Sequence, residues 1–346
     1  MNEESKYIYG IINSNQRLNF GVCGVTDSDV YTICYKDTGI VVSDSPEIDY
    51  TYMLKDAVAR LLVMHQKAIE KIMSSGYVII PVKLGTFAED ENEVIRILDK
   101  GYNLIKEIFD KINDKIEIDV VATWSDFNST LKEIACEKEI KEFKEKLSSN
   151  SKGITAEDQI KIGVMIKHAI DKKREKYAEE IQNTLKTVSC DFKAHELMDD
   201  RMVINIAFLI DKLIQKDFYQ KIEEIDTQFD GKLNFRCVGP LPAYSFYTLE
   251  IKKLNFKEID AARKILNLPE KVTSDEIKKA YHRLAFVHHP DMNRGDCPDG
   301  TVPEDEGFDG IKKACSILLD YCWLGDTCSF DKENFEKNPI IVKLRG

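Results

Sequence analysis

The sequence predicts an α+β protein in which two α+β units of related plan are followed by an all-α helical hairpin. Three observations support this. Short β-prone runs alternate with amphipathic stretches over the first 250 residues or so, and the order strand–helix–strand occurs at 77–122 and again at 201–250. After residue 255 only helical periodicity continues. The repeat is one of pattern, not of identical residues, and both units are expected to be ferredoxin-like.

The composition is that of a soluble globular protein. The chain has 346 residues, of which 43% are hydrophobic and 32% charged, and its formal net charge is -11. Because nucleic-acid binders usually have a basic balance, no nucleic-acid partner is expected. No apolar run reaches the roughly 18 residues that a membrane-spanning helix needs, and no signal peptide is visible. We therefore expect a cytoplasmic protein without membrane contact.

The nine cysteines indicate reduced thiols rather than a disulfide framework. Their number is odd, and no two of them form a CxxC pair. Their gaps fit no compact metal site, and no glycine-rich phosphate loop or nucleophile motif is present. We expect no metal, no cofactor and no catalytic residue.

Residues 1–125 form the first expected domain, which is α+β. Four β-prone runs separated by turn residues come first: KYIYGIIN, NFGVCGV, VYTICY and GIVVSD. A helix is predicted over residues 50–75, where apolar residues recur at helical spacing before Gly76. The buried strand YVIIPVKLG, a helix over 91–113 and the strand KIEIDVVATW complete this domain.

Residues 126–200 are predicted to be a charged helical connector. A Ser-, Asn- and Gly-rich cluster interrupts it at 147–155, and Thr155 and Asp158 then stand in capping-box positions. Residues 201–254 form the second α+β unit, which is expected to pack with the connector helices. It contains the buried strand RMVINIAFLI, a helix, and a strand that a Gly-Pro turn breaks in KLNFRCVGPLPAYSFYTLEI.

Residues 255–330 are predicted to form the helical hairpin, and 331–346 a tail. A short helix ends at Pro269, and the next begins with a capping box of Thr273 and Glu276. The next helix has an apolar and a largely basic face, and a third helix has one apolar stripe. The apolar face consists of Ile277, Tyr281, Leu284 and His288, and the basic face of Lys278, Lys279, His282 and Arg283. The apolar stripe of the third helix consists of Phe308, Ile311, Ala314, Cys315 and Leu318.

The tip of this hairpin reads His289-Pro290-Asp291, for which we consider a metal site, a catalytic pair and a recognition loop. His288 and His289 are adjacent, so on a helix they point about 100° apart and cannot easily hold one ion. No zinc spacing or nucleophile motif accompanies them. Pro290 ends the helix and leaves Asp291 exposed as an acceptor for a partner's arginine. A recognition loop is the interpretation that fits.

The segment DEIKKAYHRLAFVHHPDMN resembles the second helix and loop of the J-domain, and ILNL at 265–268 and FDGIKKACSILLD at 308–320 resemble its first and third helices. The resemblance implies a DnaK-type chaperone as partner, bound by His289, Pro290, Asp291 and the basic residues Lys278, Lys279 and Arg283. Ala262 and Arg263 replace a usual tyrosine pair, and His282 and Val287 stand where basic residues are frequent.

The first 250 residues resemble the gas vesicle F/L accessory-protein family. The motifs are YIYGII at 7–12, VVS at 41–43, His65, VIIPVKLGTF at 78–87 and GPLPAYSF at 239–246, in the family's order. Lys83 and Leu84 depart from the usual pattern. We interpret these residues as signatures of the fold: a core histidine, an edge or bulge in a strand, a strand corner and packing aromatics. They are His65, Pro81, Gly85, Gly239, Pro240, Pro242, Tyr244 and Phe246.

Together these resemblances imply an accessory protein of gas vesicle assembly, without enzyme activity. It would hold the apolar shell subunit at exposed strand edges, including those of YIYGII and NFGVCGV, and recruit a DnaK-type chaperone. The shell protein and other accessory proteins would be its partners, and it would be cytoplasmic and associated with gas vesicles. Two alternatives remain: a minor component of the vesicle wall with a degenerate J-domain, or an enzyme that uses the α+β units.

Overall fold

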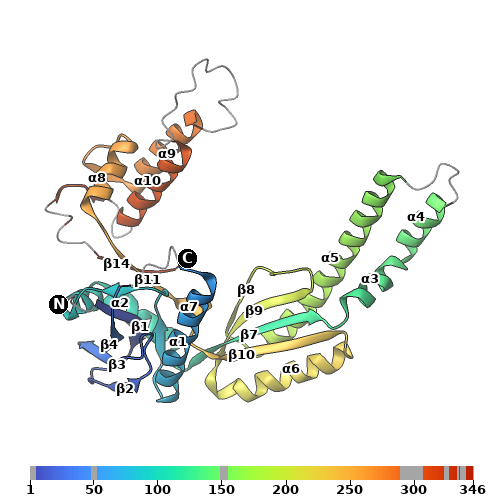
Figure 1. Cartoon of the computed structure of the whole chain (residues 1–346), viewed down its shortest axis with the longest axis horizontal. Coiled ribbons are helices and arrows are strands. Elements are labelled where there is room, and N and C mark those ends of the chain that lie inside the picture. Colours follow the sequence, from blue (N-terminus) through green and yellow to red (C-terminus); the bar gives the residue numbers. More distant parts are fainter. Residues whose placement is uncertain are drawn as a thin grey trace. The chain divides into compact units, whose positions relative to one another are not determined.

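The computed structural model describes residues 5–47, 53–148, 155–288, 307–322, 327–332, 335 and 340–345. It confirms the expected α+β class with a helical carboxy-terminal region (Figure 1). The chain divides into two compact units, each made of separate stretches of sequence. The first unit comprises Met1–Ile69, Val82–Lys106 and Leu249–Gly346, and the second comprises Glu70–Pro81 and Glu107–Thr248.

The first unit contains an antiparallel sheet in the order β2-β3-β4-β1, and the short strand β6 pairs with β1. The four predicted strands are confirmed. All six residues from Tyr7 to Ile12 are buried, as expected for a strand with a neighbour on each edge. The strands are β1 (Ser5–Ile12), β2 (Asn19–Val22), β3 (Asp29–Tyr35), β4 (Thr38–Ser45) and β6 (Phe87–Ala88).

Two helices, α1 (Lys55–Ser74) and α2 (Glu91–Ile112), follow the predicted positions, and each contributes residues to both units. The strand expected over 77–85 is shorter than predicted, because β5 covers only Ile79–Pro81. Proline has no amide hydrogen for a strand ladder, so β5 ends at Pro81. The chain then turns at Gly85, whose φ of 78° is costly for residues with a Cβ.

The second unit contains an antiparallel four-stranded sheet in the order β10-β7-β9-β8. Strand β7 belongs to the first expected strand–helix–strand segment, whereas β9 and β10 belong to the second, so both segments share this sheet. The strand β8 has no counterpart among the predicted elements. The strands are β7 (Lys115–Trp124), β8 (Asp191–Ala194), β9 (Met202–Asp211) and β10 (Leu233–Leu241).

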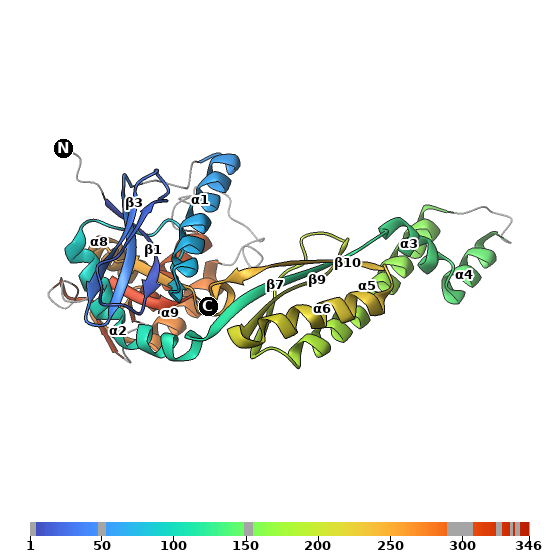
Figure 2. The ribbon, with the colours of Figure 1, turned by 90° about the horizontal axis from the view of Figure 1, so that it is seen from below.

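Long helices cover one face of this sheet (Figure 2). Helix α5 packs on β9, α6 packs on β10, and the two helices contact each other. The capping box predicted at Thr155 and Asp158 is confirmed at the start of α5. The helical elements are α3 (Phe127–Ala135), α4 (Lys138–Ser148), α5 (Ala156–Lys186), the 3-10 turn η2 (Lys212–Ile214) and α6 (Gln215–Phe229).

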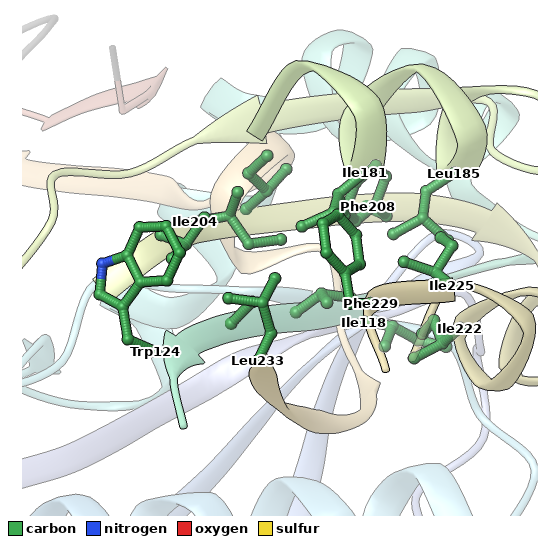
Figure 3. Close-up of a cluster of buried hydrophobic side chains, with 14 of the residues drawn as sticks. Ile118, Trp124, Ile181, Leu185, Ile204, Phe208, Ile222, Ile225, Phe229 and Leu233 are labelled. Atoms are coloured by element: carbon green, nitrogen blue, oxygen red, sulfur yellow. The ribbon is translucent and has the colours of Figure 1, made fainter. Parts of the chain in front are cut away.

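The hydrophobic core of the second unit lies between that sheet and these helices (Figure 3). Alternate residues of β7, from Ile116 to Trp124, point into it, as the alternating sequence KIEIDVVATW predicts. Phe208 of β9 is fully buried and lies near Phe218 of α6, with ring centroids 5.5 Å apart. Trp124 lies at one end of the cluster that Figure 3 draws.

The segment after β10 differs from the expected broken strand. Gly239 and Pro240 fall inside β10, where its register with β7 shifts, and their peptide bond is cis. Tyr244–Tyr247 then form a single helical turn, α7, before β11 (Leu249–Lys253). The expectation that Tyr244 and Phe246 belong to the broken strand is therefore wrong, because Pro242 precedes a turn in which the amide of Tyr247 donates to the carbonyl of Ala243.

The carboxy-terminal part of the first unit contains the predicted helical hairpin. Helix α10 contacts both α8 and α9, and together they enclose a separate core. We call residues 254–335 the helical module. The residues expected as a tail include a strand, β14, which pairs with β11. The elements are α8 (Phe256–Ile265), β12 (Lys271–Thr273), α9 (Ser274–His288), α10 (Phe308–Tyr321), β13 (Thr327–Ser329) and β14 (Ile340–Leu344).

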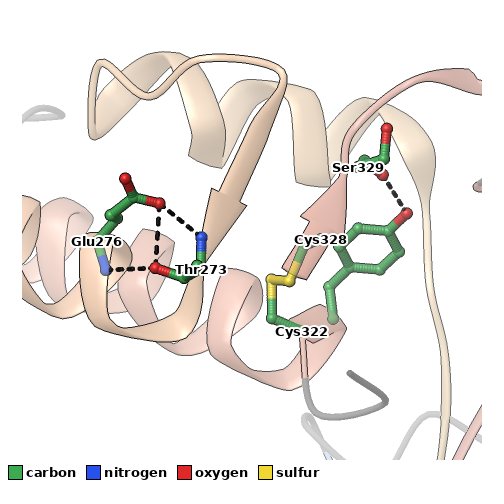
Figure 4. Close-up of a disulfide and its surroundings, with 6 residues drawn as sticks. Thr273, Glu276, Cys322, Cys328 and Ser329 are labelled. Carbon is green, nitrogen blue, oxygen red and sulfur yellow. Dashed lines mark hydrogen bonds between the residues drawn. A yellow bond between two sulfur atoms is a disulfide. The ribbon is translucent and has the colours of Figure 1, made fainter. Parts of the chain in front are cut away.

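The structure corrects the expectation that the cysteines are all reduced. Cys322 and Cys328 form a disulfide, with their Cα atoms 5.4 Å apart (Figure 4). They meet because strand β13 returns beside the end of α10 and pairs with β12, which sequence spacing does not reveal. Within the described ranges Cys34, Cys136, Cys190, Cys237 and Cys315 take part in no disulfide.

Candidate functional site

Helix α9 presents the basic face that the sequence predicts. Ile277 and Ala280 are buried against the module core, whereas Lys278, Lys279 and Arg283 are exposed. The capping box at the start of this helix is confirmed: the amide of Thr273 donates to Glu276, and the amide of Glu276 donates to the hydroxyl of Thr273 (Figure 4). This cap fixes where the helix begins and so which side chains share its outer face.

Phe286 also belongs to this outer face of α9. Its side chain is 68% exposed, which is unusual for a phenylalanine. It follows Lys279 and Arg283 at positions i+7 and i+3, so all three lie on one side of α9. The outer face of α9 therefore combines positive charge with an exposed aromatic ring, which suits a partner that is acidic and partly apolar.

The predicted loop residues His289, Pro290 and Asp291 lie outside the described residues. Their role in chaperone binding stays a prediction. The two helices that flank the loop contact each other, so the hairpin itself is confirmed.

The motifs of the first unit converge on buried Tyr7, Tyr9 and His65. The hydroxyl of Tyr7 lies 2.8 Å from Nδ1 of His65, and the ring of Tyr9 stacks on the imidazole at 5.4 Å between centroids. The hydroxyl of Tyr9 lies 3.0 Å from Ser43 Oγ of the VVS motif and accepts from the amide of Val25. Burial lowers the pKa of His65 to about 4, so its imidazole is neutral at physiological pH.

The motif around Pro81 and Gly85 positions the chain next to β11. The amide of Lys83 donates to the carbonyl of Leu249 at 2.9 Å. Thr86 donates its hydroxyl to the carbonyl of Lys83, which closes the turn around Gly85. The motif therefore forms a turn whose backbone is hydrogen-bonded to the first residue of β11.

The motif GPLPAYSF is held on the sheet of the second unit by a buried carboxylate. Glu117 of β7 is 1% exposed and accepts from both the amide and the hydroxyl of Ser245, each at 2.8 Å. His195 Nε2 lies 3.0 Å from the Ser245 hydroxyl. Gly239 permits the close approach of this segment to β7, because a Cβ there would lie 3.0 Å from the carbonyl oxygen of Glu117.

Burial raises the pKa values of Glu117 and of its neighbour Asp119, which lies two residues along the same face of β7. A carboxyl group whose pKa is raised in the folded state stabilises the fold below its unfolded pKa. That contribution is lost as the pH rises through the folded pKa. The second unit should therefore lose stability between about pH 5 and pH 8.

Replacing Glu117 by glutamine should remove the part of this loss that Glu117 causes. The amide keeps an acceptor for the Ser245 amide and carries no charge. We expect E117Q to be at least about 1 kcal/mol more stable than the wild type at pH 8, and not at pH 5. Urea unfolding followed by Trp124 fluorescence in a Trp323→Phe background measures this. The exposed Glu223→Gln is the matched control, and equal stability of E117Q and wild type at pH 8 would contradict the prediction.

A cleft of about 570 Å³ lies within the second unit beside the same motif. Residues 238–243 line it together with Tyr77, Ile79 and Ile116, so its wall is largely apolar. Within the described ranges no group of three or more His, Cys, Asp or Glu side chains could hold a metal ion. Among the described helices none is long and apolar enough to cross a membrane.

Known proteins match two parts of this chain, and we call the first part, residues 5–248, the body. Residues 5–248 match the family model "Gas vesicle synthesis protein GvpL/GvpF", and residues 252–321 match the DnaJ domain. The chain belongs to the GvpL/GvpF family and carries a DnaJ domain.

Several curated relatives are similar to the two parts. Gas vesicle protein F of Nostoc sp. is 23% identical over 242 residues, which are 69% of this chain and 96% of the relative. Gas vesicle protein F of Microcystis aeruginosa is 24% identical over 245 residues, covering 70% and 98%. The chaperone protein DnaJ of Leptothrix cholodnii is 43% identical over 56 residues, which are 16% of this chain and 14% of that protein.

The crystal structure of GvpF from Anabaena sp. PCC7120 has the same fold as the family region. Its TM-score is 0.61 at 23% sequence identity, and the match covers 71% of this chain and 98% of that structure. These relatives are matched over almost their whole length by the body alone, so the helical module is an addition to it.

Proposed function

We propose that this protein is an assembly co-chaperone of gas vesicles, without catalytic activity of its own. It would bind the apolar shell subunit through its GvpL/GvpF body and bring a DnaK-type chaperone to that client through its J-domain. The observation that carries the proposal is the presence in one chain of both parts, with the basic face of α9 exposed. The body supplies the link to gas vesicles and the module supplies the contact with the chaperone.

The client surface needs one change from the sequence-based hypothesis. YIYGII offers no exposed strand edge, because β1 pairs with β4 on one side and with β6 at Lys6 and Tyr7 on the other, and Tyr7 to Ile12 are all buried. Among the strands that the structure describes, β2 and β10 each pair with one neighbour, β3 and β7 respectively, and they contain the NFGV and GPL residues of the hypothesis, so their outer edges are candidates. The edge of β10 is favoured, since its residues Val238–Leu241 also line the apolar cleft.

Chaperone recruitment is tested with the steady-state ATPase activity of a DnaK-type chaperone. The full-length protein should stimulate this activity, and Asp291→Asn should abolish the stimulation. The double variant K278E/K279E should lower it at least about tenfold, because a charge reversal opposes an acidic partner surface. The effect should grow smaller as salt screens the contact.

A matched control for the charge reversal is K312E/K313E, two exposed lysines of α10 that change the net charge equally. Equal loss of stimulation in both double variants would assign the effect to net charge, and no stimulation by the wild type would refute recruitment. The departures at Ala262, Arg263 and His282 favour the alternative, a wall component with a degenerate J-domain. A mild urea wash of purified vesicles would leave a wall component attached and remove a transient helper.

A further inference from the structure

The helical module is connected to the rest of the first unit by two strands. β11 precedes the module and β14 follows it, and they pair antiparallel from Leu249↔Leu344 to Lys253↔Ile340 (Figure 1). The family match for the body ends at residue 248 and the DnaJ match ends at residue 321, so neither includes β14. The chain therefore enters and leaves the module through neighbouring strands.

Strand β14 is packed outside the module core. Ile340, Ile341 and Val342 are buried, yet the core cluster of the module contains residues 254–335 only. Val342 instead lies against α2: a Cβ on Gly101 would be 2.9 Å from Val342 Cγ1. A glycine inside a helix is destabilising relative to alanine, so the close approach of β14 gives Gly101 a physical reason.

Charged side chains join both strands to the module and to the body. Asp320 near the end of α10 accepts hydrogen bonds from Lys252 of β11 and Lys343 of β14. Burial alone would raise the pKa of Asp320, but these two lysines hold it below its usual value. On the side of the body, Lys253 Nζ lies 2.8 Å from a carboxylate oxygen of Glu93 of α2.

We propose that β11 and β14 form a two-stranded stem that fastens the helical module to α2, with β14 as a strap that closes the stem. A single linker would let the module reorient freely, whereas two paired strands prevent this unless β14 detaches. The inference concerns the connection alone and does not depend on the proposed function.

Limited trypsin digestion of the full-length protein tests the stem. Lys252 and Lys253 are cleavage sites inside β11, and pairing with β14 protects them. Val342→Asp places a charge against α2 and should speed cleavage at these two lysines at least about tenfold, releasing an intact module. Arg345→Asp, an exposed position beyond β14, should cleave at the wild-type rate.

A second pair of variants tests the same contact from α2. Gly101→Ala should also speed cleavage, because the new methyl group displaces Val342, and G101A/V342A should return toward the wild-type rate. Wild-type protection in both Val342→Asp and Gly101→Ala would overturn the proposal. So would a released module that is itself digested to small peptides, since β14 would then complete the module core.

Discussion

Replacing Phe208 by alanine is expected to lower the free energy of unfolding of the second unit by about 3–5 kcal/mol. Phe208 is fully buried at the middle of β9, and its ring lies 5.5 Å from that of Phe218 and 6.3 Å from that of Phe192, between centroids. Alanine removes the ring contacts and leaves a cavity between the sheet and α6 that these neighbours cannot fill without moving.

Urea unfolding of the Trp323→Phe background, in which Trp124 is the remaining tryptophan, measures this effect. Phe208→Leu should cost less than Phe208→Ala, because leucine retains most of the volume. Leu213→Ala is the control, since Leu213 is 90% exposed and its loss should change stability by less than about 0.5 kcal/mol. A loss below about 1 kcal/mol for Phe208→Ala would mean that the core rearranges to close the cavity.

Elements with a strong local pattern were the predictable part of the fold. The run KIEIDVVATW alternates apolar and polar residues except at Val121, and β7 covers Lys115–Trp124. The capping boxes at Thr155 and Thr273 likewise mark where helices begin, because the interacting groups are three residues apart. Such signals lie within one turn or one strand, so the sequence alone contains them.

Pairing between distant segments was not predictable in the same way. Strand β7 lies between β9 and β10, which are about 80 and 110 residues further along the chain. β8 has only four residues, and its burial pattern does not alternate. β14 pairs with β11, and the Cys322–Cys328 disulfide forms where β13 pairs with β12. In both cases at least one helix separates the two paired strands in the sequence. Non-local contacts of this kind leave no periodic signal in the sequence.

The candidate chaperone face was predictable in part. Helical phasing placed Lys278, Lys279 and Arg283 opposite Ile277, and the structure shows these three exposed. Phe286 was missed, because an apolar residue near the end of an amphipathic helix is ordinarily expected in the core. Only its exposed surface identifies it as part of the outer face.

The first unit is expected to lose about 3 kcal/mol of stability as the pH falls from 7 to 4, through His65. Burial holds the pKa of His65 at about 4 in the folded protein, against 6.5 for the free side chain. A histidine with a lowered pKa is neutral in the fold, so the unfolded chain binds a proton that the folded chain does not. Stability is therefore complete above pH 6.5 and falls as the pH drops toward 4. A pKa difference of about 2.5, at about 1.4 kcal/mol for each pH unit, gives the expected loss.

His65→Gln should flatten this dependence, because glutamine does not titrate and its side-chain oxygen can accept from the Tyr7 hydroxyl. NMR titration of the imidazole should show no protonation of His65 down to about pH 5. His168→Gln is the matched control for unfolding in urea at pH 7 and pH 5. A His65 signal that titrates near 6.5, or a His65→Gln variant with the wild-type pH dependence, would show that the Tyr7–His65 pair opens to solvent in the native state.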